Sequence, residues 1–501
     1  MSATLTIGSS HPKELDFENF YNVINGELTK TKEIRNGTNP STLEKNPDVP
    51  VSTVEDVNRA VDAARAAAHA WALTPWTERQ KAILSFADAL SESKLAFARM
   101  QTIEQGKPLA LAMDEIDKAV QWLTVQAKMT LPNEVVEETD EKRVVTRYTP
   151  LGVALAIVPW NSCGKIAPAL VTGNTLILKP SPYTPYCGLK LAELAQRFFP
   201  PGVFQALSGG DDLGPMLTEH PGIDKVSFTG STATGKRVMK SCSNTLKRVT
   251  LELLVYLIHG VGSVLTETSG GNDPAIVCAD VDVTETAQKI ALFSLLNSGQ
   301  ICVAIKRIYV HSSIFAEFTQ ALVQMTQAFR VGDGLGDVEL GPVQNSMQYE
   351  RVKDLLAKIE AQNLKIATEL KASDASDPTK KGYFITPTVI ENPPDDSCIV
   401  VEEPFGPVFP VLKWDTEEEV LRRANDTDMG LGASVWTKDL EKAESLASRL
   451  NAGSVWVNTH LELQPNAPFG GHKQSGIGCE WGLQGLRSYC NTQTLFLKKK
   501  R

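Results

Sequence analysis

Paired cysteines, long apolar runs and an excess of basic residues are all missing from this sequence. The eight cysteines are scattered singly, without Cys-x-x-Cys spacing, so neither a zinc site nor a disulfide framework is indicated. The longest apolar stretches, such as Val153 to Val158, have the length of a strand and are too short to span a bilayer. The N-terminal residues are polar where a secretory signal would be apolar. We therefore expect a soluble cytoplasmic protein with reduced thiols, no membrane partner and no metal.

The charge balance argues against a nucleic-acid partner. The net charge is −9 and the isoelectric point is near 5.5, whereas nucleic-acid-binding proteins usually present a basic face. The one strongly basic run, at 498–501, is typical of a solvated chain end. A chain of 501 residues is longer than a domain with a single hydrophobic core usually is, so two or three domains are expected.

Periodicity predicts helices in the N-terminal part of the chain. Residues 54–72 form an alanine-rich amphipathic pattern that follows two capping candidates, Ser52 and Thr53. Two further helical patterns cover about 77–105 and 110–128. Residues 134–150 then alternate between polar and apolar positions, which predicts an extended hairpin.

From residue 152 onward, short apolar strands alternate with helical patterns. This alternation is typical of a doubly wound α/β domain, and a second α/β series runs from about 275 to 458. Residues 486–499 alternate again and are expected to pair with the hairpin. Two exposed extended segments favour strand-mediated oligomerisation. The predicted strands are 153–158, 174–180, 203–209 and 225–230 in the first series, and 274–279, 307–312 and 453–458 in the second.

A glycine-containing turn follows the predicted strand at 225–230. Gly230 and Gly235 frame a near match to a P-loop, but Arg237 stands where that motif needs Ser or Thr. A guanidinium cannot coordinate Mg²⁺, so NTP hydrolysis is not expected. Two interpretations stay open. The glycine and the free N–H groups of the following helix can bind a phosphate, or the segment is an ordinary strand-to-helix turn with a Ser or Thr cap.

Cys302 has a different setting from the other cysteines. It ends the polar, glycine-containing turn 297–301 and precedes an apolar run. The other cysteines are interpreted as small core residues. The setting of Cys302 makes it a candidate nucleophile, with a core residue as the alternative.

The sequence Ser298 to Cys302, SGQIC, resembles the nucleophile motif of the NAD(P)-dependent aldehyde dehydrogenase superfamily. The resemblance covers nearly the whole chain, and the fungal members of the family are the most similar in character. Several motifs in the family's order are more specific than any one of them. They are VPWN (158–161), KIAPALVTGNTLILKPSPYTP (165–185), SFTGSTATG (227–235), LEL (251–253), EEPFGPV (402–408) and PFGGHKQSGIGCE (468–480).

The resemblance implies a fold and a division of the chain. The expected fold is α/β and aldehyde-dehydrogenase-like, with a Rossmann-like cofactor domain, an α/β catalytic domain and a small β oligomerisation arm. The cofactor-binding domain would comprise residues 1–131 and 151–268, and the catalytic domain residues 269–460. The arm would comprise residues 132–150 and 480–501. A homodimer or homotetramer is the expected assembly.

The resemblance also implies the oxidation of an aldehyde substrate to a carboxylic acid. The Cys302 thiolate would attack the aldehyde carbon, and the oxyanion would be held by the Asn161 side-chain amide and the Cys302 backbone N–H. Loss of hydride to the nicotinamide would leave a thioester, and Glu252 would activate the water that releases the acid. The alternative for Glu252 is a solvated residue near a strand end. Acyl transfer to coenzyme A is a competing reaction, although the presence of Glu252 favours hydrolysis.

A second set of residues would hold the cofactor, NAD or NADP. NAD-preferring relatives often carry a glutamate three residues after a lysine that contacts the adenosine ribose. In this chain Pro182 occupies that position, so the choice between NAD and NADP stays open. The resemblance assigns Lys179 to the adenosine ribose, and Ser231 and the Gly230 turn to the pyrophosphate. It assigns Glu403 to the nicotinamide ribose and Phe405 to the nicotinamide ring. It also adds Trp160 and Gly270 to the cofactor site.

Two segments depart from the family's pattern. Residues 162–164 replace a longer, mostly apolar stretch that relatives place after the asparagine. A misplacement of the oxyanion donor by about 1 Å can lower the rate on the order of a hundredfold. Relatives also read Leu-Glu-Leu-Gly-Gly, whereas residues 254–269 separate Leu253 from Gly270 here. This insert is strongly apolar at its start, unlike a typical surface loop.

We hypothesise that both departures are splice-level events, namely an intron read through in frame and a misplaced exon edge. A dominant transcript that encodes both features would contradict this hypothesis. The alternative function is a catalytically impaired subunit on the same fold, which binds nucleotide or assembles with other subunits. Turnover of a panel of aldehydes distinguishes the two functions.

Overall fold

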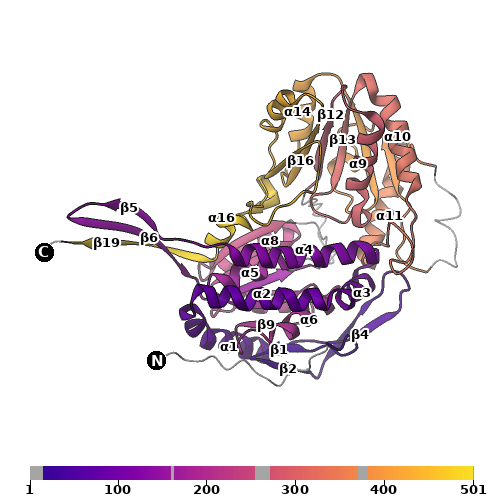
Figure 1. Cartoon of the computed structure of the whole chain (residues 1–501). Coiled ribbons are helices and arrows are strands. Elements are labelled where there is room, and N and C mark those ends of the chain that lie inside the picture. The colour runs from indigo at the N-terminus through magenta and orange to yellow at the C-terminus, as the bar shows by residue number, and fades with distance from the viewer. Residues whose placement is uncertain (1–14, 160–162, 254–270, 370–380, 500–501) are drawn as a thin grey trace.

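The chain folds into two α/β bodies and a projecting β arm (Figure 1). The computed structural model describes residues 15–159, 163–253, 271–369 and 381–499. The two bodies lie one above the other in Figure 1, and the arm extends away from both. Two short strands, β3 (Ile34–Thr38) and β4 (Lys45–Pro50), pair with each other beside the first body.

The first body contains an eight-stranded sheet whose central strands are parallel. In the central strand β7, Ala154 and Ala156 belong to the apolar cluster on one face, and Val153 and Leu155 belong to the cluster on the other. The strand is apolar throughout because both faces of the sheet are covered. In sheet order the strands are β18 (Gly476–Ile477), β11 (Arg248–Leu253), β10 (Lys225–Gly230), β7 (Val153–Val158), β8 (Thr175–Pro180), β9 (Phe204–Ala206), β1 (Asn22–Ile24) and β2 (Glu27–Thr29).

Helices cover both faces of this sheet. The predicted helices at 54–72 and 110–128 are confirmed. The pattern at 77–105 is instead two helices, because the backbone leaves helical geometry at Ser93, where φ is −92° and ψ is 8°. Both helices keep apolar residues on the buried side, so periodicity alone does not show the break. One face carries α1 (Val54–Leu73), α7 (Leu213–Glu219) and α8 (Thr232–Ser243), and the other carries α2 (Trp76–Glu92), α3 (Lys94–Gln105), α4 (Leu109–Lys128), α5 (Cys163–Val171) and α6 (Tyr186–Ala195).

The second body contains a six-stranded parallel sheet that is also covered on both faces. Ile276 faces one apolar cluster, and its neighbours Ala275 and Val277 face the other. In sheet order the strands are β14 (Thr388–Glu391), β15 (Val408–Trp414), β13 (Ile305–His311), β12 (Asp273–Val277), β16 (Gly432–Trp436) and β17 (Ser454–Val457). The helices are α9 (Val283–Leu295) and α10 (Phe315–Ala328) on one face, and α11 (Ser346–Ala361), α13 (Cys398–Val401), α14 (Glu417–Asn425) and α15 (Leu440–Ala447) on the other.

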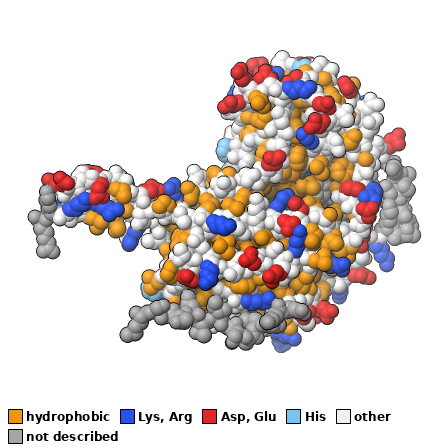
Figure 2. Space-filling view, viewed as in Figure 1, with side chains coloured by type: hydrophobic (Ala, Val, Ile, Leu, Met, Phe, Trp, Pro, Cys, Tyr) orange, Lys and Arg blue, Asp and Glu red, His pale blue; other side chains and the backbone are white. Residues whose placement is uncertain are grey.

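The arm is a three-stranded antiparallel sheet of β5 (Glu134–Glu138), β6 (Lys142–Pro150) and β19 (Cys490–Lys498). The predicted pairing of the C-terminal segment with the hairpin is confirmed, because β19 pairs with β6 along its whole length. Just before β19, α16 (Gly482–Arg487) contacts α5 of the first body. Figure 2 shows apolar side chains among charged ones on the arm. None of the helices in the described ranges is long and apolar enough to cross a membrane.

A buried carboxylate caps the first turn of α6. Glu104, on α3, accepts hydrogen bonds from the backbone N–H groups of Tyr186 and Cys187, at 2.9 and 3.2 Å. Burial raises the pKa of this carboxyl group to about 7, against the hydrogen bonds from the thiol of Cys187 and the two amides. Glu104 therefore links α3 to the start of α6 through a group that titrates near neutral pH.

The raised pKa of Glu104 predicts a specific pH dependence of stability. The folded chain holds this proton where the unfolded chain has lost it, so the contribution is full below pH 4.5 and is lost as the pH rises through 7. The free energy of unfolding should lose about 3 kcal/mol over this range from Glu104 alone. Glu104→Gln should remove this loss, whereas the exposed control Glu92→Gln should retain it. The free energy of unfolding is measured by urea unfolding from pH 4.5 to 8. The same pH dependence of this free energy in wild type and Glu104→Gln would contradict the prediction.

Candidate active site

The edge of the first sheet meets a turn of the second body at Cys302. Glu252 lies in β11, and Cys302 lies in the turn between η1 (Leu296–Gly299) and β13. The Cys302 Sγ atom lies 3.8 Å from Glu252 Oε1, within hydrogen-bond reach for a thiol. The structure thus brings together two side chains that were selected from separate motifs.

The backbone before Cys302 adopts an unusual conformation. Asn297 and Ser298 have φ angles of 54° and 56°, and Gly299 follows with 73°. A Cβ atom at Gly299 would lie 2.3 Å from the Gly406 carbonyl oxygen, so this position requires glycine. Left-handed residues other than glycine are costly and persist only where the surrounding structure fixes them. The chain reverses sharply here, just before it presents Cys302.

The surroundings of Cys302 favour the protonated thiol. The residue is 7% exposed, and burial is the main cause that raises the pKa of its thiol well above the ordinary value. The carboxylates of Glu252, Asp273 and Glu403 raise this pKa further, and a hydrogen bond from the Val303 backbone N–H lowers it. The thiol therefore keeps its proton until a nearby base accepts it.

Glu252 is the carboxylate within hydrogen-bond reach of this thiol. It is 8% exposed, so the alternative of a solvated residue near a strand end is wrong. Burial raises the pKa of its carboxyl group, Lys165 lowers it and Glu480 raises it. Glu252 Oε2 accepts a hydrogen bond from the Thr229 hydroxyl at 3.3 Å and lies 3.9 Å from Lys165 Nζ. A carboxylate whose pKa is raised is a stronger proton acceptor when it is ionised.

A buried ion pair between Lys165 and Glu480 lies beside Glu252. Lys165 Nζ lies 3.0 Å from Glu480 Oε1, and the Ser227 hydroxyl donates to the same oxygen. Neither member of the pair was predicted as a site residue, although Lys165 and Glu480 belong to two of the motifs. Lysine and glutamate are almost never buried without a partner, so the position of Lys165 at the start of an apolar run was the available signal.

Apolar side chains surround the other side of Cys302. The thiol belongs to one cluster with Val303, Leu431, Trp456 and Phe469. The ring of Trp481, which directly follows Glu480, stacks on the ring of Phe469 with centroids 4.7 Å apart. This cluster keeps water away from the sulfur on that side.

A cavity of about 840 Å³ lies at the carboxyl ends of β7, β8 and β10. Ligands of open α/β sheets bind at this edge. Lys179, Gly230, Ser231 and Pro182 are among the lining residues, so the structure brings three of the predicted cofactor residues together. The start of α8 forms one wall of the cavity.

The glycine turn fits a phosphate group. A Cβ atom at Gly230 would lie 2.5 Å from Phe228 Cζ, so a side chain there would displace the wall of the cavity. Ser231 caps α8 by accepting a hydrogen bond from the Thr234 backbone N–H at 3.1 Å. The cap matches the interpretation as an ordinary turn, but this turn also lines the cavity. A helix start that opens into a cavity attracts an anion through its N–H groups and its dipole.

Lys179 adds a buried positive charge to the cavity. Burial lowers the pKa of its ammonium group to about 8, and Asp211 opposes this change. Within the described part of the chain, Lys179 Nζ has one hydrogen-bond acceptor, the Pro180 carbonyl oxygen at 3.4 Å. An ammonium group has three donors, so two remain for a ligand. Arg237 and Lys240 also line the cavity. The residues present therefore fit a dinucleotide with its phosphates.

Glu403 and Phe405 lie on the Cys302 side and do not line this cavity. Both are buried, and the negative charge of Glu403 contributes to the pKa of Cys302. Arg351 donates to the Glu403 carbonyl oxygen at 3.0 Å, and Lys306 Nζ lies 5.3 Å from the centroid of the Phe405 ring.

Three predicted site residues lie outside the described residues. They are Trp160, Asn161 and Gly270. The insert at 254–269 and residue 162 of the shortened segment lie outside them as well. The described chain resumes at the start of α5.

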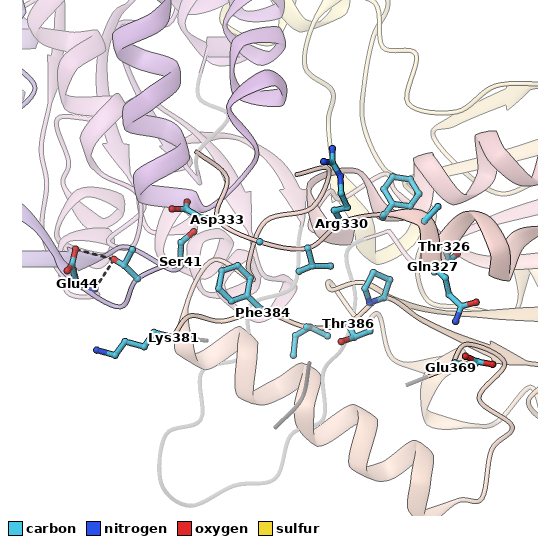
Figure 3. A pocket seen from close by; sticks show the side chains of 17 residues that line it. Ser41, Glu44, Thr326, Gln327, Arg330, Asp333, Glu369, Lys381, Phe384 and Thr386 are labelled. Carbon is cyan, nitrogen blue, oxygen red and sulfur yellow. Dashed lines mark hydrogen bonds between the residues drawn. The ribbon is translucent and has the colours of Figure 1, made fainter. Parts of the chain in front are cut away.

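A second cavity, of about 710 Å³, lies apart from this site (Figure 3). Ser41 and Glu44, from the turn between β3 and β4, line it together with Thr326 of α10 and Arg330, which follows that helix. The cavity shares no lining residue with the first one and contains none of the predicted site residues. It is therefore a cavity separate from the one at the carboxyl ends of β7, β8 and β10.

Known proteins resemble the chain along nearly its whole length. Residues 28–495 match the model of the Aldehyde dehydrogenase family. The chain is 42% identical to Aldehyde dehydrogenase LUC3 from Fusarium sp, which covers 97% of this chain and 100% of that protein. It is 39% identical to Putative aldehyde dehydrogenase FUS7 from Gibberella fujikuroi, with the same coverage. Both relatives are fungal, in agreement with the predicted similarity to fungal members.

A solved structure extends the similarity to the fold. Betaine aldehyde dehydrogenase from Staphylococcus aureus, in complex with NAD⁺, superposes with a TM-score of 0.89 at 32% identity. The match covers 96% of this chain and 95% of that one.

Proposed function

Because the chain belongs to the aldehyde dehydrogenase family and oxidises an aldehyde to a carboxylic acid, we propose that Cys302 is its nucleophile and Glu252 its general base. The observation that carries the proposal is the 3.8 Å separation of Cys302 Sγ and Glu252 Oε1 at a buried junction of the two bodies. Nothing in the comparisons favours the alternative of a catalytically impaired subunit.

The first step is the addition of sulfur to the aldehyde. Glu252 accepts the thiol proton, which the raised pKa of its carboxyl group favours. The Cys302 sulfur then forms a bond to the carbonyl carbon, and the carbonyl oxygen becomes an oxyanion. The Cys302 backbone N–H and the side-chain amide of Asn161 are the donors proposed for that oxyanion. The product of this step is a thiohemiacetal.

The second step converts the thiohemiacetal to a thioester. NAD⁺ or NADP⁺, when bound, accepts the hydride from the substrate carbon. Glu252 releases the thiol proton to solvent and then removes a proton from the water that attacks the thioester. The carbon–sulfur bond breaks, and Glu252 returns this proton to the leaving sulfur, so the products are the acid and the Cys302 thiol. Lys165, 3.9 Å from Glu252 Oε2, favours the ionised form of the carboxylate between proton transfers.

The chain binds NAD(P), and we propose that NAD is the preferred cofactor while NADP is also accepted. The proposal places the adenosine ribose at Lys179 and the pyrophosphate at Ser231 and the Gly230 turn. Glu403 and Phe405 are proposed to hold the nicotinamide ribose and ring. Pro182 supplies no carboxylate beside Lys179, so position 182 does not repel a 2′-phosphate.

A carboxylate at position 182 should narrow the choice of cofactor. We expect Pro182→Glu to raise the ratio of kcat/KM for NAD⁺ to that for NADP⁺ by about tenfold, since a charge pair in partly buried surroundings contributes at least about 1.4 kcal/mol. Steady-state kinetics with both cofactors measure the ratio. The neutral control Pro182→Gln should leave it nearly unchanged, and an equal change with both variants would refute the charge effect.

We also propose the domain division expected from the sequence. Residues 1–131 and 151–268 form the cofactor-binding domain, residues 269–460 form the catalytic domain, and residues 132–150 with 480–501 form the arm.

The exposed apolar side chains of the arm, such as Val136 and Phe496, support a homodimer or homotetramer. A monomer in sedimentation equilibrium would contradict this assembly. The seven cysteines whose side chains the structure describes are free, which supports a reducing compartment such as the cytoplasm. Microscopy of the tagged full chain tests that location.

Absorbance of the reduced nicotinamide tests the proposed function directly. Purified full-length protein is mixed with NAD⁺ or NADP⁺ and with aliphatic and aromatic aldehydes. We expect continuous formation of reduced cofactor with at least one aldehyde and an equal amount of acid. Cofactor binding without any turnover would overturn the proposal in favour of the impaired subunit.

A further inference from the structure

Two buried ionisable residues, Asp273 and His460, lie behind the Cys302 turn and have no role in the steps above. Both side chains are fully buried. Asp273 begins β12 and pairs with Ile305 of β13, three residues after Cys302. His460 follows β17, which is an edge strand of the sheet, and β16 lies between β12 and β17.

A glycine in β16 makes room for the carboxylate of Asp273. A Cβ atom at Gly432 would lie 2.1 Å from Asp273 Oδ2 and 2.8 Å from Trp456 Cζ3. The Gly432 backbone N–H donates to Asp273 Oδ1 at 3.1 Å. Any larger residue at position 432 would therefore displace the carboxylate from the place where it faces His460.

His460 connects this carboxylate to the backbone beside the nucleophile. Its Nε2 atom lies 2.7 Å from the Val303 carbonyl oxygen and 3.7 Å from Asp273 Oδ2. Because a carbonyl oxygen can only accept, Nε2 carries a hydrogen and donates it. The Trp456 ring packs against the imidazole with centroids 4.6 Å apart. The imidazole is thus held on one face and fixes the Val303 carbonyl.

The residue that His460 holds also contacts the sulfur. The Val303 backbone N–H donates to Cys302 Sγ, and this bond lowers the pKa of the thiol. The charged groups that face the thiol are the carboxylates of Asp273, Glu252 and Glu403, and Lys306 faces the same thiol and two of these carboxylates. Asp273 is the member of this group that also faces His460, the residue that donates to the Val303 carbonyl oxygen.

We propose that His460 and Asp273 are positioning residues for the Cys302 nucleophile. His460 holds the Val303 backbone so that its N–H stays on the sulfur. Asp273 faces His460 and accepts a hydrogen bond from Gly432 of β16. Its negative charge opposes ionisation of the Cys302 thiol until a base removes the thiol proton. The proposal rests on Cys302 being the nucleophile. A merely structural tie would contribute to folding stability and leave the reactivity of Cys302 unchanged.

Alkylation of Cys302 measures this reactivity without any turnover. Full-length wild type, Asp273→Asn, His460→Leu and His460→Gln are treated with iodoacetamide from pH 6 to 10, and the Cys302 peptide is quantified by mass spectrometry. Asp273→Asn should move the alkylation midpoint to lower pH by about one unit, because a negative charge near the sulfur is removed. The control Asp280→Asn, an exposed carboxylate just beyond the other end of β12, should leave the midpoint unchanged.

Steady-state kinetics test the positioning role. His460→Leu should lower kcat on the order of a hundredfold while KM changes by less than about threefold, as a small displacement of the nucleophile would. His460→Gln keeps a donor near the position of Nε2 and should recover most of the loss. An unshifted midpoint in Asp273→Asn, or equal activity of His460→Leu and wild type, would overturn the proposal. Absence of turnover in the wild type contradicts the proposed function instead, and the alkylation profiles still test the charge effect.

Discussion

Cys302→Ala is expected to abolish aldehyde-dependent reduction of the cofactor, with kcat lower by about four orders of magnitude or more. The loss is this large because removing a nucleophile removes the covalent route, and the residual rate comes only from binding and orientation of the reactants. The measurement is the rate of absorbance change at the band of the reduced nicotinamide, with cofactor binding followed separately by fluorescence.

The variant should still bind the cofactor, since Cys302 lies outside the cavity that contains Gly230 and Lys179. Cys278→Ala is the matched control, because Cys278 is a buried thiol at the end of β12 and has no place in the site. It should retain activity within a few-fold of wild type. Comparable activity of the Cys302 and Cys278 variants would remove Cys302 from the mechanism.

Glu252→Gln is expected to separate the two halves of the reaction. The amide cannot accept a proton, so water is not activated and the thioester persists. We expect one equivalent of reduced cofactor per subunit, formed more slowly than in wild type because the thiol proton also lacks its acceptor. A steady rate lower by about two to four orders of magnitude should follow. Stopped-flow absorbance over the first turnover resolves the two phases.

The pH dependence gives a second test of the same residue. Burial raises the pKa of Glu252, so in wild type the release of acid should accelerate as the pH rises through that pKa. The acceleration should be absent from the slow phase of Glu252→Gln. Glu441→Gln, an exposed glutamate on α15, controls for the loss of one negative charge. Unchanged steady turnover in Glu252→Gln would exclude Glu252 as the base.

Much of the fold could be predicted from the sequence because each signal is local. The apolar runs at 153–158 and 225–230 became β7 and β10, and the alternating C-terminal segment pairs with the hairpin as expected. The family and fold are confirmed by the comparisons. The short edge strands β2 and β18 were not predicted, since a strand of two or three residues carries too little pattern to recognise.

The contacts that tune the site could not be predicted in the same way. Lys165 and Glu480 form an ion pair although they lie far apart in the sequence, and His460 and Val303 are hydrogen-bonded across a similar separation. The spacing of residues in the sequence does not predict such contacts, because these residues meet only after both sheets have folded. The choice of Cys302 and Glu252 rested on motifs, whereas their separation and the burial that raises both pKa values are properties of the folded chain.

The two segments that depart from the family's pattern follow proposed site residues in the sequence. Residues 254–269 follow Glu252 by one residue, and residues 162–164 follow Asn161. Sequencing the transcript tests the splice hypothesis, and a dominant mRNA that encodes both segments would contradict it. Kinetics of the chain as it stands and of a chain without residues 254–269 would then measure how the insert affects Glu252.

The central claim is that Cys302 carries the acyl group that Glu252 helps to release. The most direct measurement is peptide mass spectrometry of Glu252→Gln, quenched in acid after reaction with NAD⁺ and an aldehyde that wild type oxidises. The account predicts that the peptide containing Cys302 gains the mass of the acyl group, in an amount equal to the burst of reduced cofactor. A burst without this adduct, or an adduct on a different cysteine, would contradict it.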